Sequence, residues 1–258
     1  MDSTLGHELH CISWLLVNKA DVRTLVALFG IEELEGTSWK TGFKKFITLT
    51  IQERNKRQTR KDWNLFDEKN EYPLIIFQLS DNWTMIFSHY FDMKDRALTI
   101  CNTLSKEHLK VYCFFFDVHV GCRRWIIFED GQMKRYCEED SDSVVTVIGE
   151  LLSEERKIFE KVINEDNGSF DDSEIIALYV PELTTISYEA FCNRDFYFYH
   201  GQIKPIVDAS QISWDQLPQE RIMLWPFLFE NHESEEEKIE SEKNTPNSYE
   251  SELDDLPF

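Results

Sequence analysis

The chain has 258 residues and carries 48 acidic against 27 basic side chains, a formal net charge of −21. With 42% hydrophobic and 14% aromatic residues, it has enough apolar side chains to bury a sizeable core. A charge this negative repels phosphate, which argues against a protein whose main activity is non-specific nucleic-acid binding.

The first third of the chain predicts mainly helical structure. Apolar residues recur at roughly helical spacing over Leu9–Phe29, and Gly30 is a suitable helix end, so we expect an N-terminal helix or helix pair. Ile47–Ile51 predicts a short strand, and the basic stretch Arg54–Lys61 after it predicts a solvated helix or loop.

The middle third begins with a predicted β-hairpin and a helix. Leu74–Leu79 and Trp83–Ser88 are apolar runs separated by a turn at Asp81-Asn82. Asp92 is placed to cap a helix from Lys94 to about Leu104. We expect the hairpin and the helix to follow one another directly.

Three further strands are predicted after this helix, at Leu109–Val118, Arg123–Phe128 and Met133–Cys137. Asp130-Gly131 joins the last two, because Asp and Gly tolerate the positive φ of a tight hairpin turn. The element order β-β-α-β-β-β favours an antiparallel sheet with a helix on it.

The last third is less regular. Ser143–Val162 predicts a helix, and Glu174–Val180 fits either a strand or a short helix that Pro181 ends. Phe196–Tyr199 predicts a strand, and the apolar run Ile222–Phe229 closes the body.

These elements predict an α+β fold: an antiparallel sheet with helices packed on one face, an N-terminal helix and a disordered acidic C-terminal tail. We place a globular body at residues 1–229, which leaves room for two subdomains with a break near residues 140–170, and the tail at residues 230–258. No stretch approaches the roughly 18 apolar residues of a membrane span, and no signal peptide precedes the body, so we expect a cytoplasmic protein. Six scattered cysteines are expected to be reduced.

The tail ends on an ordered set of residues. Glu252 precedes Asp254, Asp255, Leu256, Pro257 and Phe258, and the final ring carries the α-carboxylate. Such an ending suits a partner that has an apolar pocket, a basic group for the carboxylate and a basic rim for the aspartates.

Residues 250–258 resemble the C-terminal tip of bacterial single-stranded DNA-binding protein, an acidic linker that ends in Asp-Asp-(Ile/Leu)-Pro-Phe. The resemblance implies docking onto genome-maintenance proteins that recognise such tips, among them repair helicases, exonucleases, primosome proteins and clamp-loader subunits. It does not extend to the body, which carries 37 acidic and 25 basic residues without the tail and lacks the positive groove of an OB module.

Three functions therefore stay open. The first is a non-enzymatic interaction factor of bacterial or phage origin, whose tip recruits or blocks a DNA repair or replication enzyme. The second is an acidic immunity protein or inhibitor that neutralises a basic toxin or nuclease through the body. The third is an enzyme with an unrecognised site.

No catalytic signature supports the third function. The stretch Gly36–Lys44 has the wrong glycine spacing for a phosphate loop, and Phe43 stands where that motif needs lysine. Asp117 and His119 share a strand face and form a candidate acid–base pair, although a hydrogen-bonded polar strand end explains them more simply. His7 and His10 could bind metal but have no evident further ligands, so we expect no metal or cofactor.

Four basic residues lie in the predicted hairpin of the body. Arg123, Arg124, Lys134 and Arg135 flank the Asp130-Gly131 turn. They could form a basic patch for an acidic partner or for the chain's own tail, or simply neutralise neighbouring glutamates. Direct nucleic-acid binding is not expected.

Overall fold

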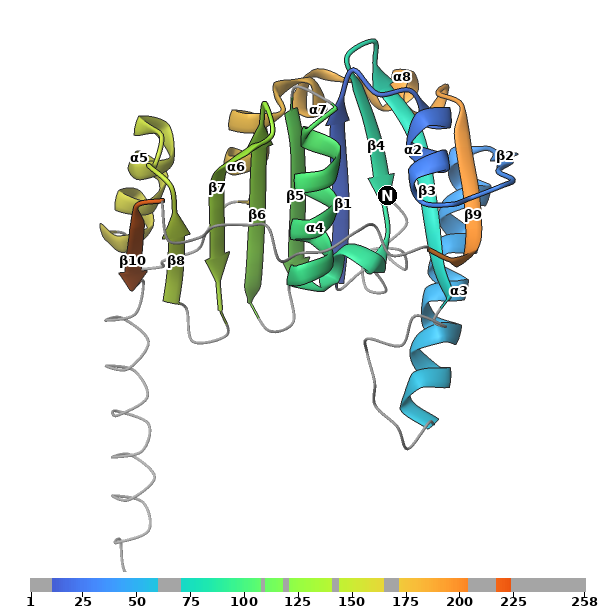
Figure 1. The fold of residues 1–258 in the computed structure, drawn as a ribbon, viewed down its shortest axis with the longest axis horizontal. Helices are drawn as coiled ribbons and strands as arrows, with labels where there is room; N and C mark the ends of the chain where they lie inside the picture. The colour runs from blue at the N-terminus through green and yellow to red at the C-terminus, as the bar shows by residue number, and fades with distance from the viewer. Residues whose placement is uncertain are drawn as a thin grey trace, which may run out of the picture.

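The computed structural model describes residues 11–59, 71–107, 110–117, 121–140, 144–164, 172–203 and 217–223. Its strands join in one sheet in the order β10-β8-β7-β6-β5-β1-β4-β3-β9-β2, and every pair is antiparallel (Figure 1). The strands are β1 (Cys11–Asn18), β2 (Glu35–Thr37), β3 (Glu71–Ser80), β4 (Trp83–Phe87), β5 (Lys110–Asp117), β6 (Cys122–Glu129), β7 (Gln132–Glu139), β8 (Val144–Ile148), β9 (Phe196–Gln202) and β10 (Gln219–Met223).

Helices connect these strands and cover the sheet. They are α2 (Val22–Leu28), α3 (Trp39–Thr59), the 3₁₀ turn η1 (His89–Asp92), α4 (Lys94–Ser105), α5 (Ser153–Asn164), α6 (Asp172–Tyr179), α7 (Pro181–Thr185) and α8 (Tyr188–Cys192). The antiparallel sheet with helices confirms the α+β class. None of the described helices is both long and apolar enough to cross a membrane.

Helices lie on both faces of the sheet, so the expectation that they pack on one face is wrong. Leu15 and Val17 of β1 face a core that α2 and α4 cover, while Trp14 and Leu16 face a second core. Figure 1 shows α2 and α4 in front of the sheet, with α6 and α7 behind it. Consecutive apolar residues along a strand make both faces apolar, and each face then needs its own cover.

The second core is rich in aromatic rings. Phe46 of α3, Phe159 of α5 and Ile175 of α6 are all buried in it. Phe159 stacks on Trp125 of β6 with 6.2 Å between ring centroids. Aromatic pairs bury large areas, so they fix these helices firmly to the strands.

The predicted N-terminal helix is replaced by a strand and a short helix. Residues 11–18 form β1, which lies between β4 and β5 in the middle of the sheet. A run such as Ile12–Val17 is apolar on both sides and therefore fits a doubly buried strand as well as a helix. Hydrogen bonding to β4 on one side and β5 on the other stabilises this run as a strand.

Asp21 caps the short helix α2, which supports a prediction about stability. Its side chain accepts a hydrogen bond from the Thr24 backbone N–H at 2.7 Å, and this bond lowers the pKa of the carboxyl. Replacing Asp21 with Ala should cost about 1 kcal/mol of unfolding free energy at neutral pH. Urea titrations of the two proteins measure this difference.

The same cap should depend on pH in a defined direction. A carboxyl whose pKa is lower in the folded state stabilises the protein above its unfolded pKa, and this contribution is lost as pH falls through the folded value. The gap between wild type and Asp21→Ala should therefore shrink as pH falls below the ordinary aspartate pKa of 3.8. Asp21→Asn is the matched control, because it keeps a capping oxygen that does not titrate; an unchanged gap at acid pH would contradict the argument.

Two other predictions of secondary structure are wrong. Ile47–Ile51 lies within α3, where Phe43, Phe46 and Ile47 share a buried face at helical spacing. From residue 144 on, the predicted helix Ser143–Val162 is instead divided into strand β8 and helix α5, with Gly149 at a φ of 90° between them. A positive φ cannot continue a helix, so the periodicity spans two elements.

Most of the middle third is confirmed. Strands β3 and β4 form the predicted hairpin, and α4 matches the predicted helix with Ala97, Ile100, Cys101 and Leu104 buried. The turn at Asp130-Gly131 has positive φ at both residues. Asp92 does not cap α4, because Met93 takes that position; Asp92 instead contacts His89 Nδ1 at 2.8 Å.

The predictions for the last third of the chain are confirmed in part. Residues 172–179 form helix α6, the alternative left open for Glu174–Val180, and Phe196–Tyr199 lies in β9 as predicted. β8, within the expected break, pairs with both β7 and β10, so the sheet continues across it. Of the final apolar run only Ile222 and Met223 are described; the tail lies outside the described residues.

Candidate functional sites

The residues of the tail tip, Glu252 and Asp254 to Phe258, lie outside the described residues, as do His7, His10 and His119. Asp117 is described and ends strand β5, where it pairs in register with Cys122. The acid–base pair that we considered for Asp117 and His119 therefore stays a prediction. The described body offers three other polar clusters.

The first cluster contains the arginines of strand β6, which point to opposite faces of the sheet. Arg123 Nη1 donates to Glu139 Oε2 at 2.6 Å. Burial raises the pKa of the Glu139 carboxyl, and the Arg123 charge opposes this only in part. Arg124 is buried and donates to the backbone oxygens of Phe91 at 3.1 Å and Asp92 at 2.8 Å.

The second cluster surrounds Glu155, which is fully buried at the start of α5. Its carboxylate accepts from Arg135 Nη2 at 2.7 Å, from Trp125 Nε1 at 3.2 Å and from the Tyr179 hydroxyl at 2.6 Å. The Leu152 backbone N–H donates to it at 2.8 Å, which is the backward half of a capping box. One carboxylate thus connects strands β6 and β7 to helices α5 and α6.

The electrostatics of this cluster favour a charged pair. Burial acts to lower the pKa of the Arg135 guanidinium, but the charge and hydrogen bonding of Glu155 together with Tyr179 outweigh burial, and the net pKa lies above the ordinary value. Burial first, and Glu155 second, raise the pKa of Tyr179, so its hydroxyl stays a proton donor. The ion pair of Arg135 and Glu155 is a structural element that joins the sheet to the helices that cover it.

The four basic residues do not form the patch that we considered. Arg124 and Arg135 are buried on opposite faces, Arg123 is paired with Glu139, and only Lys134 is exposed. Adjacent strand residues such as Arg123 and Arg124 point to opposite faces of the sheet, and Arg135 is bound to the buried carboxylate of Glu155. The alternative of internal neutralisation describes them better.

A shallow groove of about 490 Å³ lies beside the second cluster. Arg135, Lys134 and Tyr179 line it together with Leu152 and Pro218. Glu129 and Glu150 also line it, and Glu155 already neutralises Arg135, so the groove has no net positive charge to attract an anion. We assign it no ligand.

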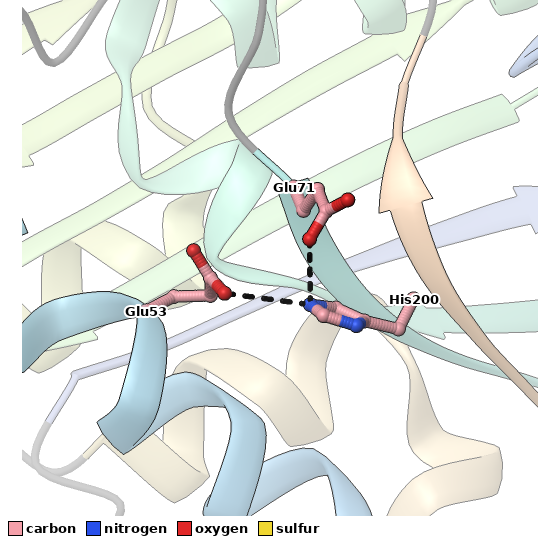
Figure 2. A group of neighbouring side chains, drawn as sticks. All are labelled: Glu53, Glu71 and His200. Carbon is pink, nitrogen blue, oxygen red and sulfur yellow. Dashed lines mark ion pairs between the residues drawn. The ribbon is translucent and has the colours of Figure 1, made fainter. Parts of the chain in front are cut away.

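The third cluster brings together Glu53 of α3, Glu71 at the start of β3 and His200 of β9 (Figure 2). His200 Nε2 lies 3.8 Å from Glu53 Oε1 and 3.8 Å from Glu71 Oε2. Strand pairing places His200 opposite Pro73, two residues from Glu71, and α3 packs against both strands. These are residue types that bind metal ions.

Sequence reasoning missed this cluster. Glu53 and Glu71 lie on either side of the α3–β3 connection, and His200 is far away in the chain. No spacing motif relates the three positions. The pairing of β3 with β9 and the packing of α3 against both strands bring them together.

Three buried cysteines of the body are poor candidates for catalysis. Cys101, Cys113 and Cys137 are buried free thiols, and burial raises the pKa values of Cys101 and Cys137. A thiol with a raised pKa is a poor nucleophile. These side chains fill the core as small hydrophobic groups.

Comparisons with protein-family models, with curated proteins and with solved structures find no match to this chain.

Proposed function

We propose that this protein is a non-enzymatic interaction factor whose C-terminal tip docks onto proteins that recognise the tip of single-stranded DNA-binding protein. The observation that carries the proposal is the ordered ending Asp254-Asp255-Leu256-Pro257-Phe258 after an acidic stretch. Docking would recruit a repair or replication enzyme or block its tip pocket.

The charges of the body support placing this contact on the tip. Outside residues 230–258 the chain still carries 37 acidic against 25 basic side chains. The arginines of β6 and the buried Arg135 are engaged with internal acceptors. A body of this kind favours a basic protein partner over nucleic acid.

The contribution of Phe258 can be given a rough size. Burying an aromatic ring contributes about 1.5–3 kcal/mol, and a charge-assisted hydrogen bond to the α-carboxylate adds about 1.5–3 kcal/mol. Deleting Phe258 from the full chain should therefore weaken binding to a tip-recognising exonuclease or helicase by roughly 100-fold or more. Fluorescence anisotropy with a labelled peptide of residues 249–258 measures the affinity directly.

Matched variants make this test specific. Tyr249→Ala removes an aromatic ring near the tip but not in it and should leave affinity almost unchanged. A peptide with an amidated C-terminus tests the requirement for a free carboxylate, and rising salt should weaken binding because the linker is acidic. If the chain without Phe258 recovers the same partners as the full chain, the proposal is wrong.

The net negative charge of the body supports one alternative function, that of an immunity protein or nuclease inhibitor that acts through charge complementarity. A chain that ends at Phe229 separates the two functions. Tip docking predicts that this truncation abolishes partner binding. Protection of cells against a basic toxin by the truncated chain would instead favour the alternative.

A further inference from the structure

We propose that Glu53, Glu71 and His200 bind a divalent transition-metal ion such as zinc(II). This site would lie on the body, and its existence does not depend on the function of the tip. The three side chains come from α3, β3 and β9, and their candidate ligand atoms all lie within 4.8 Å of one another (Figure 2).

The imidazole of His200 supplies the first argument. Its Nε2 atom is buried and has no hydrogen-bond partner among the described residues. Both neighbouring carboxylate oxygens are 3.8 Å away, which is beyond the roughly 3.2 Å of an N–H···O bond. A buried ring nitrogen without a partner is costly, and a metal ion would satisfy it.

The distances supply the second argument. Zinc lies about 2.0–2.2 Å from nitrogen and carboxylate ligands, so neighbouring ligands of a tetrahedral ion are roughly 3.4 Å apart. The observed separation of 3.8 Å from His200 Nε2 to each carboxylate needs only a few tenths of an ångström of contraction, while the carboxylate oxygens of Glu53 and Glu71, which lie within 4.8 Å of each other, need up to about 1.4 Å. Small side-chain rotations provide that movement.

Burial and charge supply the third argument. The side chain of Glu53 is 10% exposed and that of His200 is 21% exposed, while Glu71 is 48% exposed. Two carboxylates at a partly buried position attract a divalent cation, and the exposed side at Glu71 leaves room for a water molecule as a further ligand.

Lys56 competes with a metal ion for this position. Its Nζ donates to Glu53 Oε1 at 2.5 Å, the same oxygen that faces His200. The Lys56 side chain is 56% exposed and flexible, so a metal ion can displace its ammonium group. The Lys56 ammonium group therefore lowers the affinity for a metal ion. Removing it should raise that affinity, whereas removing a ligand should lower it.

The ligand types select the metal. Imidazole suits zinc, iron, nickel and copper, whereas magnesium and calcium prefer sites made of oxygen ligands alone. Among divalent first-row ions the affinity order places zinc above manganese and iron. We therefore expect zinc to bind more tightly than manganese, and magnesium to bind weakly.

The test is a titration of the full-length protein with zinc(II), followed by calorimetry and by thermal unfolding. Binding to the folded state should raise Tm with increasing free zinc. Glu71→Gln and His200→Ala should each lower zinc affinity by more than the roughly 10–100-fold that loss of an outer-shell partner costs. Lys56→Met should raise it.

Controls separate this site from other metal ligands of the chain. A variant with Gln in place of His7 and His10 should bind zinc like wild type, as should His89→Gln, since neither set belongs to the cluster. Cobalt(II) should give a spectrum without thiolate-to-metal charge transfer, which excludes the cysteines. Because the Glu71 side chain is 48% exposed, Glu71→Gln should fold like wild type.

Two results would overturn the proposal. One is the absence of zinc-dependent stabilisation in wild type at free zinc well above micromolar concentrations. The other is zinc binding that survives His200→Ala and Glu71→Gln but disappears in the variant without His7 and His10. The three side chains would then form only an ion-paired cluster.

Discussion

Replacing Glu155 with Gln should lower the free energy of unfolding by about 3–5 kcal/mol, because it leaves the buried Arg135 guanidinium without its counter-charge. The carboxylate accepts from Arg135, Trp125, Tyr179 and the Leu152 backbone. In Gln an NH2 group replaces one carboxylate oxygen, so a hydrogen-bond donor would face the donors that now bind that oxygen. Urea unfolding followed by tryptophan fluorescence measures the loss.

Two comparisons isolate the buried charge as the cause. Glu154→Gln changes the neighbouring exposed residue in the same helical turn and should have little effect. The double variant Arg135→Met with Glu155→Gln removes both charges and keeps an amide oxygen as acceptor for Trp125 or Tyr179, so it should be more stable than Glu155→Gln alone, since no unpaired charge remains. Equal stability of Glu155→Gln and Glu154→Gln would contradict this account.

Gly149→Ala is the second change with a large expected effect. Gly149 has a φ of 90°, and a Cβ atom placed there would lie 2.2 Å from the Lys134 carbonyl oxygen. Backbone strain and overpacking together should cost roughly 3–5 kcal/mol. Gly149 lies between β8 and α5, close against β7. The Lys134 carbonyl oxygen belongs to the backbone of β7, so it cannot move away as a flexible side chain can.

Two other glycines separate strain from close contact. Gly121 also has a positive φ, of 69°, but a Cβ there meets nothing within 4 Å, so Gly121→Ala should cost only about 1–2 kcal/mol. Gly36 has neither restriction, and its Ala variant should be nearly neutral. Thermal unfolding of the three variants should rank them in that order. A Gly149→Ala protein as stable as Gly121→Ala would show that the contact with Lys134 relaxes easily.

The middle of the chain was predicted well because its signals are local. The hairpin of β3 and β4, helix α4 and the Asp130-Gly131 turn each depend on residues close together in sequence. A turn residue that tolerates positive φ acts without help from the rest of the fold. Such elements can therefore be predicted from a single sequence.

The errors occur where an apolar run fits two structures. Residues 11–18 form a central strand and residues 144–148 an inner one, although both runs also fit helices. Long-range pairing decides such cases, because a doubly buried strand needs neighbours on both sides. For the same reason the sequence could not show that helices cover both faces.

The sequence by itself determined the net charge, the acidic ending with its terminal phenylalanine, and the turns and helices that depend on neighbouring residues. Only the tertiary structure decided that Arg124 and Arg135 are buried on opposite faces and that Glu53, Glu71 and His200 meet. Charge and local conformation are properties of short stretches of chain. Burial and the meeting of distant side chains depend on which strands pair, and here that pairing joins β3 to β9 across more than a hundred residues.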